Sequence, residues 1–101
     1  MMRDISQEEG KRMLAEGKVV LVDVRTPEEF KAGHIPGAIN IRNESIKGEP
    51  EELPDKNARI LLYCRSGLRA EDAMIKLDEL GYTNLFNMGG ILDWKGPITR
   101  N

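Results

Sequence analysis

The single cysteine of this 101-residue chain, Cys64, lies between a hydrophobic run and a basic loop that contains glycine. The surrounding stretch reads ILLYCRSGLRAEDA, from Ile60 to Ala73. The thiolate is the nucleophilic form of cysteine, and nearby arginines or a helix N-terminus stabilise a thiolate over a thiol. We therefore predict that Cys64 is a reactive nucleophile, in contrast to the small buried side chain that a lone cysteine commonly is.

The residues that follow Cys64 have the features of an anion-binding loop. Gly67 allows a tight turn in which several backbone N–H groups point inward, and Arg65 and Arg69 add positive charge. The loop also leads into the clearest helical pattern of the chain, and the first N–H groups of a helix lack intrahelical partners. The candidate binding residues are Arg65, Ser66, Gly67, Leu68 and Arg69.

Composition excludes several other kinds of site. One cysteine allows neither an internal disulfide nor a CxxC motif, and one cysteine with one histidine leaves too few soft ligands for a metal site. Two reactions need only a thiolate in an anion cradle. These are phosphoryl transfer through a phosphocysteine and sulfur transfer through a cysteine persulfide, and the residue types by themselves leave both open.

Alternating patterns along the chain predict the elements that position the loop. Apolar runs predict strands at residues 19–24, 37–41, 59–63 and 83–88. Capping residues and three- to four-residue apolar steps predict helices at residues 6–17, 26–32, 67–82 and 89–94. This alternation predicts one α/β domain over residues 1–101 with a largely parallel sheet. Cys64 then lies at the carboxyl end of a strand, where such sheets bind their ligands.

Composition and charge also bear on partners and location. Hydrophobic residues make up 40% of the chain and charged residues 32%, which predicts a compact, very soluble domain. The net charge of −2, with both signs interspersed, indicates no nucleic-acid partner. No apolar run approaches the roughly 20 residues of a membrane span, and the first residues lack the apolar core of a signal peptide. We therefore expect a cytoplasmic monomer without a membrane partner.

Three segments of the chain resemble the single-domain rhodanese family, the thiosulfate sulfurtransferase-like proteins. They are LVDVRTPEEFKAGHIPGAINI, YCRSGLRA and LGYTNLFNMGGILDW, and the resemblance extends from Ile5 to Trp94. It implies a rhodanese-like α/β fold, with a mainly parallel sheet of about five strands and helices on both faces. It also implies that Cys64 is the nucleophile and that backbone amides of its loop hold first the thiolate and then a persulfide.

The resemblance gives different roles to the other motif residues. Three of them match positions that are mainly scaffold, and we expect them to support the structure: Asp23, Arg25 and His34. Arg65 is the candidate for attracting an anionic sulfur donor, whereas Arg69 is expected to brace the loop. No cofactor and no metal are expected, because the covalently bound sulfur is itself the intermediate.

Loop length favours sulfur transfer over phosphoryl transfer. Phosphatases of related fold have five residues between cysteine and arginine, whereas four residues separate Cys64 from Arg69, and a shorter ring suits one sulfur atom better than a phosphate. Tyr63 also stands where phosphatases typically have a histidine. We therefore expect a sulfurtransferase that moves a sulfane sulfur from thiosulfate or a persulfide donor to a thiol or to cyanide. A phosphatase or arsenate reductase is the lesser alternative.

The alternative from a different class is a persulfide carrier without turnover or a protein-interaction module. Rhodanese-like modules that only bind partners often lack the cysteine, so the presence of Cys64 in an intact loop argues against that alternative. A carrier would share every residue named above with an enzyme. The thiol acceptor is accordingly expected to be either a small molecule or another protein.

Overall fold

The computed structural model describes residues 1–101, and its centre is one sheet of five strands. The strands are β1 (Met2–Asp4), β2 (Val20–Asp23), β3 (Ile39–Asn40), β4 (Arg59–Cys64) and β5 (Asn84–Gly90). They are hydrogen-bonded in the order β1-β5-β4-β2-β3, and every neighbouring pair is parallel. The predicted α/β class with a parallel sheet is therefore confirmed, and β4, which ends in Cys64, is the central strand.

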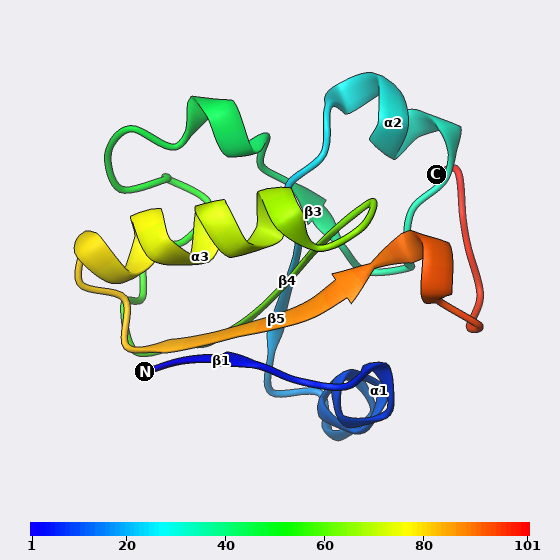
Figure 1. Ribbon diagram of the computed structural model, residues 1–101, viewed down its shortest axis with the longest axis horizontal. Coiled ribbons are helices and arrows are strands. Elements are labelled where there is room, and N and C mark those ends of the chain that lie inside the picture. Colours follow the sequence, from blue (N-terminus) through cyan, green and yellow to red (C-terminus); the bar gives the residue numbers. More distant parts are fainter.

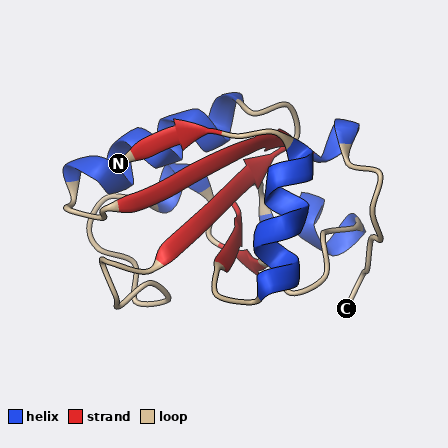
Figure 2. Ribbon diagram, turned by 90° about the horizontal axis from the view of Figure 1, so that it is seen from below, coloured by secondary structure: helices blue, strands red, loops and turns tan.

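Helices cover both faces of this sheet. The α-helices are α1 (Gln7–Glu16), α2 (Pro27–Ala32) and α3 (Leu68–Glu79), and two short 3-10 turns are η1 (Asn43–Ser45) and η2 (Ile91–Asp93). Figure 1 shows α3 on one face of the sheet and α1 on the other. Figure 2 shows the long strands pointing the same way, so their carboxyl ends meet at one edge. None of the helices has the length and apolar character needed to cross a membrane.

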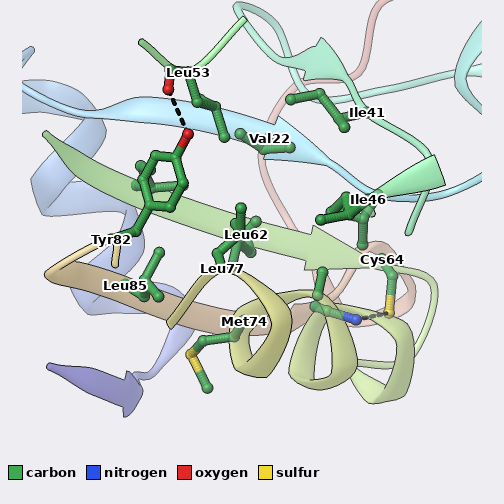
Figure 3. Close-up of a cluster of buried hydrophobic side chains, with 14 residues drawn as sticks. Val22, Ile41, Ile46, Leu53, Leu62, Cys64, Met74, Leu77, Tyr82 and Leu85 are labelled. Carbon is green, nitrogen blue, oxygen red and sulfur yellow. Dashed lines mark hydrogen bonds between the residues drawn. The ribbon is translucent and has the colours of Figure 1, made fainter. Parts of the chain in front are cut away.

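The two faces of the sheet carry two separate clusters of buried side chains. Ile60, Leu62 and Cys64 of β4 belong to the larger cluster, which also contains buried residues of α3. Leu61 and Tyr63 belong to the smaller cluster on the opposite face. Because successive side chains of a strand point to opposite faces, a strand buried on both sides has the continuous apolar run seen in this sequence. Cys64 therefore faces α3, at the end of the larger cluster (Figure 3).

The helix starts follow the capping signals of the sequence. Ser6 accepts a hydrogen bond from the backbone N–H of Glu9 at 3.0 Å and so caps α1. At α2, Thr26 and Glu29 form a complete capping box, in which each side chain accepts a hydrogen bond from the other's backbone N–H. The reciprocal bond is absent at α1, where the carboxylate of Glu9 lies 3.6 Å from the guanidinium of Arg3.

Two features differ from the predicted elements. Strand β1 was not predicted, because all three of its residues are exposed and an exposed edge strand has no apolar alternation to detect. The second difference concerns Gly89 and Gly90, which were expected to open the last helix. They instead continue β5 to its end, and the helix shortens to the single turn η2.

Candidate functional site

Cys64 lies at the last position of β4, where the chain turns into α3. Its side chain is almost completely buried, with 1% of its surface exposed. The sulfur accepts hydrogen bonds from the backbone N–H groups of Gly67, at 2.9 Å, and of Ala70, at 3.4 Å. Figure 3 shows the second of these bonds beside the first turn of α3. The sulfur thus faces N–H donors at a helix N-terminus, where negative charge is stabilised.

The N-terminus of α3 lacks the usual side-chain cap. Its N-cap residue is Gly67, which has a left-handed backbone with φ of +109° and no side chain to bond the first turn. The third N–H of the helix, that of Ala70, is bonded instead by the sulfur of Cys64. The cysteine therefore occupies the position of a capping group, and the loop closes a ring around it.

The end of β5 presses directly against this loop. A Cβ atom added to Gly90 would collide with the carbonyl oxygen of Arg65 and lie 2.6 Å from the Cα of Ser66. A Cβ added to Gly67 would lie 3.2 Å from the Cα of Gly89. The backbone N–H of Leu92, just after β5, also donates to the Arg65 carbonyl at 3.3 Å. The loop therefore depends on a close approach between two backbones that only glycine permits.

Asn87 is a site residue that sequence reasoning missed. Its amide nitrogen donates to the carbonyl of Gly67 at 3.2 Å, and its amide oxygen accepts from the N–H of Gly89 at 2.8 Å. The side chain therefore ties the end of β5 to the cysteine loop. Its place two residues before the pair Gly89 and Gly90 is the only local signal, and that signal does not reveal a partner 20 residues away.

Arg69, the second arginine of the loop, is held by α2. Its guanidinium donates to both carboxylate oxygens of Glu29, from Nη1 to Oε1 at 2.7 Å and from Nη2 to Oε2 at 3.0 Å. The Oε1 atom of Glu29 also accepts from the backbone N–H and the hydroxyl of Thr26, at 3.0 and 3.1 Å. The hydrogen bonds from Arg69, followed by those from Thr26, lower the pKa of Glu29 from 4.5 to about 2 against the opposing effect of burial. One carboxylate therefore joins the start of α2 to the start of α3.

This ion pair predicts a pH-dependent contribution to stability. Because the folded state lowers the pKa of Glu29, its stabilising effect is complete above about pH 4.5 and is lost as the pH falls towards 2. Glu29→Gln is expected to lower the free energy of unfolding at pH 7 by about 1–2 kcal/mol, since the pair is partly solvated. Urea unfolding at a series of pH values should show this difference from the wild type shrinking below pH 4.5.

The matched control is Glu28→Gln, a change at an exposed residue in the same helix that forms no salt bridge. It should leave stability within about 0.5 kcal/mol of the wild type. A Glu29→Gln deficit that stays constant from pH 7 to pH 3 would contradict an effect of the carboxylate charge.

The rim of the site is open to solvent. Arg65 and Ser66 are exposed, and their side chains form no hydrogen bond or ion pair within the chain. Leu68 and Leu92 are also exposed, to 75% and 61%. None of the four surface hollows, of about 290 to 540 Å³, is lined by a residue of the loop from Cys64 to Arg69. The sulfur therefore lies beneath an open surface, and no deep pocket encloses its reaction partner.

Asp23, Arg25 and His34 lie away from the sulfur, around the segment that follows α2. Asp23 and Arg25 form a buried ion pair, with 2.7 Å between Oδ2 and Nη2. The same Nη2 donates to the carbonyl of Gly33 at 2.7 Å. The ring of His34 stacks on Phe30 and its Nδ1 lies 2.8 Å from the Phe30 carbonyl oxygen. These contacts join the end of β2 to the segment after α2.

The register of the sheet explains why these residues do not face the sulfur. Asp23 is opposite Tyr63, whose side chain lies in the smaller cluster. Cys64 is the next residue, and its side chain lies in the larger cluster on the other face. The structure therefore brings together Cys64 and the loop up to Arg69, whereas Asp23 sits on the opposite face of the sheet.

Known proteins share both the sequence and the fold. The family described as the Rhodanese-like domain matches residues 6–97. "Thiosulfate sulfurtransferase PspE" of Escherichia coli (strain K12) is 40% identical over 77 residues, which cover 75% of this chain and 74% of that protein. A protein named "Sulfurtransferase" from Allochromatium vinosum is 38% identical over 96 residues, covering 93% of this chain and 89% of its own length.

A solved structure agrees with these relatives. The structure of the human single-domain sulfurtransferase TSTD1 matches with a TM-score of 0.77 and 32% sequence identity, covering 86% of this chain and 88% of that one. One assignment follows from three findings: the parallel five-stranded sheet, the cysteine at the end of its central strand, and the matches over most of the chain. The chain belongs to the rhodanese-like domain family.

Proposed function

We propose that this protein is a sulfurtransferase that moves a sulfane sulfur from thiosulfate or a persulfide donor to a thiol acceptor, through a persulfide on Cys64. The observation that carries the proposal is the position of the sulfur, which accepts two backbone hydrogen bonds at the head of α3 beneath an open loop. Relatives that are named sulfurtransferases and cover most of the chain support it.

The reaction takes place in two balanced steps. The Cys64 thiolate attacks the outer sulfur of thiosulfate, a new S–S bond forms, and the S–S bond of thiosulfate breaks with its electron pair leaving on sulfite. The protein then carries the negative charge on the outer persulfide sulfur. An acceptor thiolate, or cyanide, attacks that sulfur and takes it over, and the electron pair of the broken S–S bond returns to Cys64 as a thiolate.

The loop supplies the electrostatic part of this chemistry. The N–H groups of Gly67 and Ala70 already point at the sulfur, so no reorganisation is needed when negative charge moves onto it. The same donors stabilise the thiolate when it returns as the leaving group of the second step.

The ion pair of Arg69 argues against the phosphatase alternative. An arginine that binds a phosphate does so with a free guanidinium fork. In this protein the fork of Arg69 is occupied by both oxygens of Glu29. Together with the short loop, this supports transfer of a single sulfur atom over transfer of a phosphoryl group.

Intact-protein mass spectrometry after brief exposure to thiosulfate tests the proposal. The protein should gain the mass of one sulfur atom, and cyanide or a thiol should remove it with formation of thiocyanate or a small persulfide. Prior alkylation of Cys64 should prevent the gain. No gain from thiosulfate and none from a small-molecule persulfide would overturn the proposed function.

Arg65 is the proposed binding group for an anionic donor, because its guanidinium is exposed at the rim and has no partner within the chain. Arg65→Ala is expected to raise the Michaelis constant for thiosulfate about five- to tenfold, since an exposed charge contributes about 1 kcal/mol. The turnover number should change little, and Arg65→Lys should retain most of the affinity. Steady-state kinetics at two salt concentrations measure the effect. An unchanged Michaelis constant would remove Arg65 from this role.

A persulfide carrier that serves a protein partner is the second candidate function. The exposed Leu68 and Leu92 favour it, because a protein surface could cover both leucines, whereas a small thiol could not. A carrier should load quickly from a donor and turn over poorly with small acceptors. The protein acceptor, the monomeric state and the cytoplasmic location stay predictions from the sequence.

A further inference from the structure

We propose that Gln7, in the first turn of α1, is a positioning residue for the reaction at Cys64, and that it acts through the backbone on either side of Gly89. The inference rests on the proposed function for its kinetic consequence. Its effect on Cys64 itself can be measured without any sulfur transfer.

Gln7 binds the end of β5 from the opposite side to the cysteine loop. Its amide nitrogen donates to the carbonyl of Met88 at 2.8 Å and to the carbonyl of Gly90 at 3.0 Å. Both protons of the amide group are therefore used, and both partners lie more than 80 residues away in the sequence. The side chain therefore binds the carbonyl groups on both sides of Gly89.

These two carbonyls belong to an irregularity in the sheet. Leu62 of β4 is opposite Asn87 of β5. Cys64 is opposite Gly90, so β5 takes three residue steps where β4 takes two. Gly89 has a left-handed backbone with φ of +91°. An extra residue of this kind disrupts the regular ladder of backbone hydrogen bonds, and Gln7 supplies donors to the carbonyls at this bulge.

The bulge contacts the backbone of the cysteine loop and so fixes the position of the N–H groups that donate to the sulfur. Gly90 touches the backbone of Arg65 and Ser66 so closely that a methyl group would not fit between them. The Cα of Gly89 lies 3.2 Å from the place that a Cβ of Gly67 would take, and the N–H of Gly67 donates to the sulfur at 2.9 Å. A displacement of the bulge would therefore move the donors that stabilise the thiolate. Displacements of about 1 Å at such groups can change rates a hundredfold.

The oxygen atom of the Gln7 amide also supports a role of Gln7 in function. Its Oε1 is buried and has no hydrogen-bond partner, and no other buried side-chain nitrogen or oxygen in the protein is left in this way. A buried acceptor without a partner is unfavourable. The amide nitrogen of Gln7 therefore holds the bulge, while its unpaired oxygen lowers the stability of the protein. Residues that contribute to function commonly lower stability in this way.

The test replaces Gln7 by methionine, which has a similar length and no donor. Gln7→Met is expected to slow persulfide formation from thiosulfate about tenfold to a hundredfold. The Michaelis constant for the donor should stay within about threefold of the wild type, because Arg65 is untouched. Alkylation of Cys64 by iodoacetamide at pH 7 should be slower than in the wild type. Thermal stability should fall, because the carbonyls of Met88 and Gly90 lose their donor and the removal of the unpaired Oε1 offsets only part of that loss.

Two further variants complete the experiment. Glu8→Gln changes the exposed neighbour of Gln7, which forms no hydrogen bond to β5, and should match the wild type in every measurement. Gln7→Glu keeps the shape but turns a carboxylate oxygen towards two carbonyls, and should be at least as impaired as Gln7→Met at neutral pH. If Gln7→Met does not fold, Gln7→Glu provides the same test of the role of Gln7.

The outcomes separate the two proposals. A folded Gln7 variant with wild-type turnover and an unchanged rate of Cys64 alkylation would overturn the role of Gln7. A wild-type protein that takes no sulfur from any donor would overturn the proposed function instead. In that case slower alkylation of Cys64 in Gln7→Met would still support the positioning of Cys64 by Gln7.

Discussion

Cys64→Ser is expected to reduce sulfur transfer to the uncatalysed background while the protein remains folded. A serine hydroxyl is not ionised at neutral pH and cannot form a persulfide, so both steps of the reaction are lost. The oxygen can still accept from the N–H groups of Gly67 and Ala70, and stability should stay within about 1 kcal/mol of the wild type. Thiocyanate formation from thiosulfate and cyanide measures the activity, and urea unfolding measures the stability.

Cys64→Ala separates chemistry from structure at the same position. It removes the nucleophile and also leaves two N–H donors without the sulfur that they now bond. It should therefore be as inactive as Cys64→Ser and less stable by about 1–3 kcal/mol. Turnover in either variant clearly above the background would exclude Cys64 as the nucleophile.

Gly90→Ala is expected to impair both activity and stability, because the added methyl group has no space. It would collide with the carbonyl oxygen of Arg65 and approach the Cα of Ser66. These atoms belong to the backbone, so no change of side-chain rotamer relieves the collision and the loop itself must move. We expect a loss of about 1–3 kcal/mol in the free energy of unfolding. Turnover should fall at least about tenfold, since the loop carries the donors to the sulfur.

Gly48→Ala is the matched control for this substitution. A Cβ at Gly48 would meet nothing within 4 Å, and the backbone there is not left-handed. Its stability and activity should lie close to the wild type, within about 0.5 kcal/mol. Wild-type turnover in Gly90→Ala would show that the cysteine loop tolerates displacement, and would also weaken the case for Gln7.

The local parts of the fold could be predicted from the sequence. The complete capping box of Thr26 and Glu29 depends on residues three positions apart, and the apolar steps of α3 lie on consecutive turns. The apolar run of β4 identifies a strand buried on both faces. Because these signals are encoded within a few residues, they also place Cys64 between a strand and a helix.

Other parts of the fold carry no local signal. Strand β1 is exposed along its whole length and is held by its pairing with β5. The bulge at Gly89 arises from the register between β4 and β5, and a pair of glycines in a sequence is equally consistent with a turn. The sequence accordingly predicted the order of the main elements better than the edge of the sheet and the end of β5.

The sequence by itself was enough to predict Cys64 as the nucleophile and determined the N–H-rich loop around it and the strand and helix that present it, since all of these lie between Arg59 and Glu79. Only the tertiary structure decided how the loop is held. Glu29 and Arg69 are 40 residues apart, and Gln7 and Gly90 are 83 residues apart. Such partners meet because parallel strands bring their carboxyl ends, with the segments that follow them, to one edge of the sheet. A glutamate that caps one helix and a glutamine in the first turn of another thereby gain roles at a cysteine that their sequence neighbours do not reveal.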